Sequence, residues 1–231
     1  MLLIGSSSYA LAADAIVDDV VIVESAYDWS GVYLGVFGGW AHSRTKATDI
    51  TGTDFDGNTP GATRSMSDDG FVGGVTAGYN FQNGSWVFGP EVELGWASND
   101  KLEFAPDDSD EGLSTEYGFY GAITGRVGFA ANRTLFYAKG GLALAQIENI
   151  AGDYDSGEPD RDDAAVGDEL RAGWTIGAGV EHAITDRWSI KGEYLYADFG
   201  SKTYDTPENT DEPFKFEDTL HTVKIGLNYQ F

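Results

Sequence analysis

Cysteine is absent from the 231-residue chain, which excludes a disulfide scaffold and any metal or thiol chemistry based on cysteine. Basic residues are also scarce, with 14 Lys and Arg against 38 Asp and Glu, a formal net charge of −24. A charge of this sign excludes a broad basic surface for nucleic acid phosphates. No apolar run reaches the roughly 18 residues that a membrane-spanning helix requires. The chain is therefore expected to be either soluble or a membrane β-barrel.

Glycine and aromatic residues are abundant: the chain has 31 Gly, 6 Trp, 12 Tyr and 13 Phe. This composition and length suit a single β-rich domain, because single barrels and sandwiches often reach such a size. A second full domain is not expected.

The first twelve residues, MLLIGSSSYALA, combine an apolar start with an A-x-A pattern of the kind that signal peptidase cleaves. They lack a basic n-region and are shorter than usual, so residues 1–12 are interpreted as a signal peptide remnant from a truncated or misassigned start. The alternative is a disordered cytosolic N-terminus. Residues 13–28 are acidic and are predicted to be a periplasmic tether, followed by the barrel over residues 29–231.

Alternation of apolar and polar residues, bounded by turn residues, predicts eight strands. The predicted ranges are 30–43, 70–81, 86–98, 116–130, 135–147, 170–184, 188–199 and 219–231. Most reach the roughly 9 to 11 residues that a tilted transmembrane strand needs. The fold class expected is all-β, an eight-stranded antiparallel up-and-down transmembrane β-barrel.

The predicted connections alternate between long and short. Long loops are expected at 44–69, 99–115, 148–169 and 200–218, and tight turns at Asn83-Gly84, 131–133 and 185–187. Asn-Gly is a strong two-residue hairpin signal, because both residues tolerate the positive φ of a type I′ turn. In an up-and-down meander all long loops then lie at one end, and both termini lie with the tight turns at the other. The four loop regions with their flanks hold 28 of the 38 acidic residues.

The two faces of the strands differ in chemistry. One is rich in aliphatic and aromatic residues, and the other carries Gly, Thr and charged side chains. An eight-stranded barrel has room inside only for its own side chains, so the aromatic face is assigned to the lipid side. On the first strand Tyr33 and Phe37 alternate against Val32, Leu34 and Val36, and the aliphatic set is assigned to lipid. Aromatic girdles are expected at both interfaces, with Trp29 at the tight-turn end and Phe199 at the loop end among their members.

The charged face then points into the lumen, where four acids and five bases can neutralise one another, as buried charges require. The predicted lumen ion-pair network consists of Glu91, Glu93, Arg126, Lys139, Arg171, Glu181, Lys191, Glu193 and Lys224.

Several segments resemble the small outer-membrane β-barrel proteins of alphaproteobacteria, a porin-like surface-protein family related in architecture to the OmpA membrane domain and the opacity proteins. The matching segments are ALAADA, DWSGVYLGVFGGW, GGVTAGYNFQNGSWVFGPEVEL, GRVGFAANRTLFYAKGGLALA, WTIGAGVEHAITDRWSIKGEYLYADFG and the terminal HTVKIGLNYQF. The resemblance implies a location in the outer membrane and a C-terminal signal for the barrel-assembly machinery, formed by Val223, Ile225, Leu227, Tyr229 and Phe231.

Two sequence features could bind ligands. His42 and His221 are expected to be neighbours once the first and last strands pair, which allows a shared metal or haem contact, with interfacial polar residues as the favoured interpretation. An acidic segment offers a weak divalent-cation loop through Asp153, Asp155, Asp160, Asp162 and Asp163, although its spacing departs from the EF-hand pattern. The favoured interpretation of these aspartates is that they are solvated acids of a surface loop without a bound cation. No cofactor is expected.

We therefore expect a non-enzymatic outer-membrane barrel that serves envelope structure and surface interaction through acidic extracellular loops, with a narrow or plugged lumen. The expected partners are outer-membrane lipid and lipopolysaccharide, reached through divalent cations, and the assembly machinery; homo-oligomers are compatible with the sequence. The alternatives are a narrow cation-preferring porin and a haem- or small-ligand-binding surface barrel. A soluble barrel that binds an apolar ligand and a lipid-modifying enzyme using His42 and His221 complete the set of hypotheses.

Overall fold

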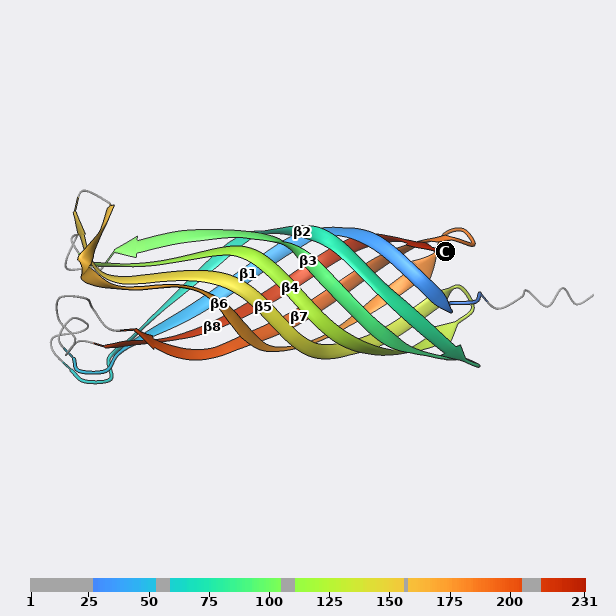
Figure 1. The fold of residues 1–231 in the computed structure, drawn as a ribbon, viewed down its shortest axis with the longest axis horizontal. Helices are drawn as coiled ribbons and strands as arrows, with labels where there is room; N and C mark the ends of the chain where they lie inside the picture. Colours follow the sequence, from blue (N-terminus) through green and yellow to red (C-terminus); the bar gives the residue numbers. More distant parts are fainter. Residues whose placement is uncertain (1–26, 53–58, 105–110, 156–157, 205–212) are drawn as a thin grey trace, which may run out of the picture.

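The computed structural model describes residues 27–52, 59–104, 111–155, 158–204 and 213–231. These residues form eight strands in one closed barrel, in which each strand pairs antiparallel with the next and β1 pairs with β8 (Figure 1). The strands are β1 Gly31–Asp49, β2 Thr63–Asn83, β3 Trp86–Phe104, β4 Glu111–Ala131, β5 Thr134–Asp155, β6 Glu158–Ala183, β7 Trp188–Tyr204 and β8 Phe214–Gln230. The predicted fold class is confirmed. In the described part of the chain, no helix is long and apolar enough to cross a membrane.

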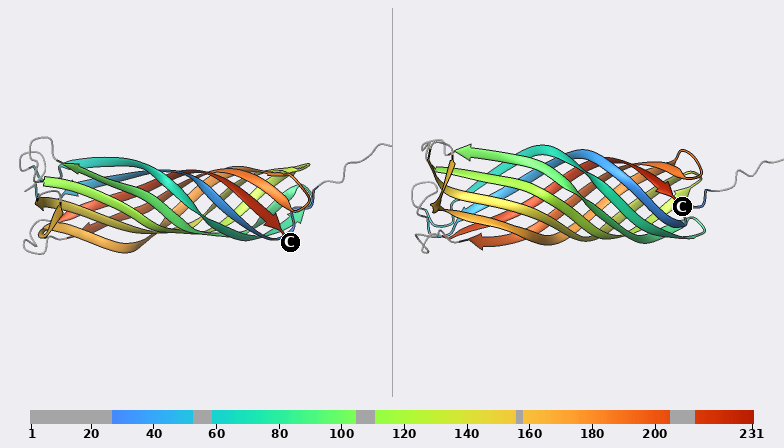
Figure 2. Two further views of the ribbon diagram at one scale, coloured as in Figure 1. Left: turned by 90° about the horizontal axis from the view of Figure 1, so that it is seen from above. Right: turned by 45° about the horizontal axis from the view of Figure 1, so that its top comes forward.

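The tight turns lie at the same end of the barrel as the start of β1 and the end of β8, as the two further views also show (Figure 2). The turn between β2 and β3 differs in one detail from the prediction. Asn83 pairs with Trp86, so the central residues are Gly84 and Ser85, and Gly84 has a φ of 60°. Glycine at the first central position with a single positive φ fits a type II′ turn, which suits the strand twist as well as type I′ does.

The strands continue far into the segments predicted as long loops. β1 and β2 stay paired out to Thr48 and Thr63, and β5 and β6 out to Asp155 and Glu158. The predicted loop at 148–169 is therefore a paired hairpin. In these extensions the outward positions no longer face lipid, so the sequence loses the alternation of apolar and polar residues that marks a strand. On β1, for example, Arg44 and Lys46 stand at outward positions where large apolar residues would otherwise be.

Outward side chains form a band of exposed large apolar residues around the barrel. On β1 the band runs from Val32 to Trp40; at the other end of the chain it runs from Val223 on β8 to Phe231, the residue after β8. The predicted facing of strand one is confirmed, because Val32, Leu34 and Val36 are about half exposed whereas Tyr33 and Phe37 are buried. This arrangement contradicts the soluble barrel, which required the aromatic face to point inward.

Trp29 and Phe199 do not belong to the aromatic girdles. Their exposed fractions are 1% and 4%, and both side chains lie inside the barrel. Trp29 packs with Tyr27, Leu135 and Tyr137 in a buried cluster close to the tight turns. Its backbone amide donates a hydrogen bond to Gln82 Oε1 (2.7 Å), which ties the segment before β1 to the end of β2.

Buried side chains occupy successive levels of the lumen beyond this cluster. A middle level is charged, and the next is an apolar cluster that includes Phe37, Tyr120 and Leu220. Near the long-loop end, Phe214 and Phe216 pack with Met66 and Ala47. Close packing of this kind is expected, because eight strands enclose a space that side chains can fill.

Candidate functional site: the charged lumen

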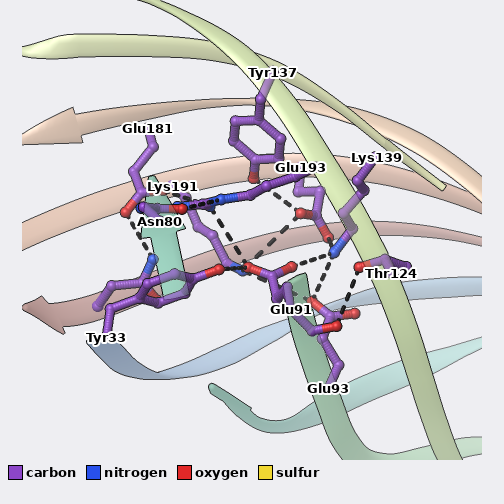
Figure 3. A network of polar contacts seen from close by, with 12 residues as sticks. Tyr33, Asn80, Glu91, Glu93, Thr124, Tyr137, Lys139, Glu181, Lys191 and Glu193 are labelled. Atoms are coloured by element: carbon purple, nitrogen blue, oxygen red, sulfur yellow. Dashed lines mark hydrogen bonds and ion pairs between the residues drawn. The ribbon is translucent and has the colours of Figure 1, made fainter. Parts of the chain in front are cut away.

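Eight of the nine residues predicted for the lumen network come together at the middle level of the barrel. They project inward from β3, β4, β5, β6, β7 and β8, and most of them are labelled in Figure 3. The group consists of Glu91, Glu93, Arg126, Lys139, Glu181, Lys191, Glu193 and Lys224, with exposed fractions of 4% or less. It contains four acids and four bases, so its formal charges cancel.

Three carboxylates and three lysines form the centre of the network. Lys139 Nζ lies 2.7 Å from Glu91, 3.1 Å from Glu93 and 2.8 Å from Glu193. Lys224 Nζ lies 2.6 Å from Glu93 and 3.0 Å from Glu193, and Lys191 Nζ lies 3.4 Å from Glu91. Every carboxylate at the centre thus contacts at least two ammonium groups, which compensates for its removal from water.

The same three carboxylates are the one group of potential metal ligands that converges among the described residues, with ligand atoms within 4.8 Å of one another. Their negative charge is already matched by the ammonium groups of Lys139, Lys191 and Lys224. A divalent ion would have to displace buried lysines and leave them unpaired, at a high cost in free energy. The arrangement therefore fits ion pairing rather than a metal centre.

Arg126 and Glu181 extend the network toward the tight turns. Arg126 Nη1 lies 3.1 Å from Glu181 and 3.6 Å from Glu91, and its Nε donates to Asn80 Oδ1 (2.9 Å). Glu181 Oε1 also accepts hydrogen bonds from Ser189 (2.5 Å) and Asn228 (2.7 Å). Charge-assisted hydrogen bonds on several oxygens make a buried carboxylate tolerable.

Aromatic hydroxyls complete the pairing of the carboxylates. Tyr33 donates to Glu91 Oε2 (2.7 Å) and Tyr137 donates to Glu193 Oε2 (2.9 Å). Glycines make room for both rings: a Cβ at Gly78 would lie 2.2 Å from the Tyr33 hydroxyl oxygen, and one at Gly179 would lie 2.5 Å from that of Tyr137. The small residues on the inward face therefore position the charged centre.

Arg171 belongs to a second, separate site nearer the long-loop end. Its Nη1 pairs with Asp218, and its Nη2 donates to the carbonyl oxygens of Phe199 (3.1 Å) and Gly200 (3.0 Å). Asp218 also accepts hydrogen bonds from Thr45 (2.6 Å) and Asn149 (3.1 Å). Asp218 is an acid that the sequence interpretation missed, and its charge balances that of Arg171.

The other predicted ligand residues lie elsewhere. His42 and His221 face outward as directly opposite partners on β1 and β8, as predicted. The neighbouring hydroxyl of Thr222 points inward, on the opposite face of β8 from His221, so it cannot serve as a nucleophile beside that histidine. The residues of the predicted divalent-cation loop, Asp153, Asp155, Asp160, Asp162 and Asp163, belong to β5 and β6, and their side chains are outside the described residues. Cation binding there stays a prediction.

On the strands that project beyond the apolar band, ion pairs are exposed. Lys202 Nζ lies 3.0 Å from Glu169, and the Lys202 side chain is 51% exposed. Hydrogen bonds from Tyr204 and Lys202 lower the pKa of the Glu169 carboxyl. Such pairs are screened by water and contribute little to stability.

Comparison with known proteins decides the family. The family model described as outer membrane protein beta-barrel domain matches residues 1–231, the whole chain. The chain belongs to this family. A relative, the 31 kDa outer-membrane immunogenic protein of Brucella melitensis, is 33% identical over 233 residues, which cover 96% of this chain and 93% of that protein. The 22 kDa outer membrane protein of Rhizobium leguminosarum is 31% identical over 90% of this chain and 81% of its own length.

Solved structures agree on the barrel fold of this outer-membrane protein family. The outer membrane protein OprG from Pseudomonas aeruginosa superposes with a TM-score of 0.54 at 12% identity, covering 87% of this chain and 97% of that chain. The outer membrane protease OmpT from Escherichia coli gives a TM-score of 0.50 at 7% identity, covering 87% and 97%. At such identities the likeness shows the fold alone. The Brucella and Rhizobium relatives are named as outer-membrane proteins, and neither name denotes an enzyme.

Proposed function

We propose that this outer-membrane barrel is a non-enzymatic envelope protein whose lumen is closed by its own side chains. The observation that carries the proposal is the succession of buried levels along the lumen, from Trp29 through the charge-balanced network to Arg171 and Asp218. A pore would need these groups to separate, and each separation would leave a buried charge without its partner, at a cost of several kcal/mol. The function then resides in the outer surface and the projecting strands.

A solute-uptake experiment tests the closed lumen. Liposomes that contain the refolded wild-type protein should swell in an isotonic solution of a small sugar no faster than protein-free liposomes. Rapid swelling with the wild type would show an open path and favour the narrow porin instead. The double variant Lys224→Ala, Glu193→Ala removes one base and one acid from the network without changing its net charge. Faster swelling with this variant than with the wild type would show that these ion pairs alone prevent passage of the sugar.

The orientation in the membrane forms part of the proposal. Short turns face the periplasm in outer-membrane barrels, so both ends of the chain are placed there and the projecting strands outside the cell. Because the chain has no cysteine, single cysteines report orientation cleanly. In intact cells, a membrane-impermeant thiol reagent should label Ser65→Cys on the projecting part of β2 and leave Asp186→Cys in a tight turn unlabelled. The reverse pattern would invert the orientation.

The projecting strands are also proposed to contact lipopolysaccharide through bridging divalent cations. Glu116, Glu148 and Asp168 are directly opposite one another on β4, β5 and β6, beyond the apolar band, which supports this contact. Lipopolysaccharide that copurifies with the protein should then be released by a chelator, and its retention after chelation would argue against the bridge.

A further inference from the structure

His42 and His221 form a cross-strand pair on the outer surface of the barrel. They are directly opposite in the register of β1 and β8, and their ring centroids are 6.2 Å apart. Both lie two residues beyond the end of the apolar band at Trp40 and Val223, and the His42 side chain is 45% exposed. The pair is therefore open to water at the outer edge of the band.

Hydrogen bonds orient both rings through the same nitrogen. His42 Nδ1 lies 2.7 Å from Asp69 Oδ1, which also accepts a hydrogen bond from Trp40 Nε1 (3.2 Å). His221 Nδ1 lies 2.8 Å from the Tyr194 hydroxyl oxygen. Nε2 is thus the ring atom left for a ligand on each histidine. A metal-bound histidine characteristically uses its other ring nitrogen in such a bond to a carboxylate or similar partner.

The separation of the rings suits one bridging ion. With a metal–nitrogen bond of about 2.0–2.1 Å, each imidazole centroid lies about 3.2 Å from the metal, so two rings on one ion can be at most about 6.4 Å apart. The observed 6.2 Å falls just inside this limit, so the two rings would bind on nearly opposite sides of the ion, as the tetragonal geometry of Cu²⁺ allows. Imidazole pairs prefer late first-row ions, and Cu²⁺ is bound more tightly than Zn²⁺ or Ni²⁺.

We propose that His42 and His221 bind one divalent transition-metal ion through their Nε2 atoms, with water completing its coordination. Asp69 is a positioning residue that holds the His42 ring. The formal charge of −24 attracts cations to the surface. Because β1 and β8 are the first and last strands, the ion bridges the seam that closes the barrel, and it stabilises the folded state, in which alone the two rings meet.

His182 supplies a matched control within the chain. It also faces outward at the surface, and its Nδ1 also has a hydroxyl partner, Thr134 Oγ1 at 3.0 Å. Its cross-strand neighbours are Thr134 and Ile190, so it has no second histidine opposite. Replacing it removes one imidazole without disturbing the pair.

The test titrates Cu²⁺ and Zn²⁺ into tag-free, refolded protein in detergent by calorimetry. We expect one ion per wild-type chain, with Cu²⁺ bound more tightly. His42→Ala and His221→Ala should each weaken binding by more than about tenfold, the double variant by little more than either single one, and His182→Ala by less than about twofold. Equal losses in all three single variants, or none in any, would overturn the proposal.

Electron paramagnetic resonance of the Cu²⁺ complex gives an independent readout that a folding defect does not mimic. Two imidazole nitrogens should couple to copper in the wild type and in His182→Ala, and one in His42→Gln. A Cu²⁺ signal without any nitrogen coupling in the wild type would assign the binding to surface carboxylates and overturn the proposal. The midpoint of thermal unfolding should rise with metal in the wild type and stay unchanged in His42→Gln.

Discussion

Replacing Lys139 with methionine is expected to lower the free energy of unfolding by about 3–5 kcal/mol, the range for breaking a buried ion pair by removing one partner. Lys139 Nζ lies within 3.1 Å of Glu91, Glu93 and Glu193, and none of these four side chains is exposed. Methionine keeps most of the volume but leaves four carboxylates facing three bases. The unpaired carboxylate has no access to water in the folded state, whereas water solvates it in the unfolded state. The substitution therefore raises the free energy of the folded state alone.

Urea unfolding of the refolded protein in lipid vesicles measures this effect. The matched control is Lys202→Met, which breaks a half-exposed pair with Glu169 and should cost no more than about 1 kcal/mol. The compensated variant Lys139→Met, Glu93→Gln restores the charge balance and should lose less than the sum of its two single variants. Equal losses for Lys139→Met and Lys202→Met would show that the network is hydrated rather than buried.

Replacing Ile225 with arginine is expected to cost about 2–4 kcal/mol of folding free energy, as for a base on the lipid face near the bilayer midplane. Ile225 is 65% exposed on β8, and its cross-strand neighbours Gly38 and Gly192 offer no side chain to shield a charge. Folding into defined lipid without any assembly machinery separates this cost from the proposed role of Ile225 in the C-terminal signal.

The control for this substitution must also face outward. The sequence pattern suggests Thr222→Arg as a tolerated change on the lumen face, but Thr222 is only 2% exposed, so an arginine there would overpack the interior. Thr219→Arg is the better control, because Thr219 faces outward beyond the apolar band and lies between Asp198 on β7 and Arg44 on β1, whose opposite charges offset one another. It should cost at most about 1 kcal/mol. Comparable losses at positions 225 and 219 would contradict the lipid-facing assignment of β8.

Period-two alternation predicts the strands and their facing only where one side meets lipid. It assigns Val223, Ile225 and Leu227 to the outside correctly, and all three are exposed. It fails beyond the band, where Lys46 and Thr48 replace apolar residues although β1 remains paired. It also fails before β1, because the position of Trp29 inside the mouth of the barrel depends on contacts with β2 and β5 rather than on alternation.

Alternation gives the face of a residue but not its height in the barrel. Arg171 and Glu181 share the inward face of β6, yet the ten residues that separate them correspond to about 33 Å of strand. This distance follows from the residue numbers alone, and it is far longer than an arginine side chain. The sequence is therefore sufficient to exclude a contact between Arg171 and Glu181. The partner of Arg171, Asp218, could not be found in this way, because it lies in a segment predicted as a loop and meets Arg171 only through the pairing of β6, β7 and β8.

Single-channel recording in a planar bilayer tests the central claim, a lumen closed by its own ion-paired side chains, most directly. The refolded wild type should insert and show no discrete conductance steps at physiological salt. Discrete, cation-selective steps that grow in the Lys224→Ala, Glu193→Ala variant would contradict the closed lumen and would show instead that the network gates a pore.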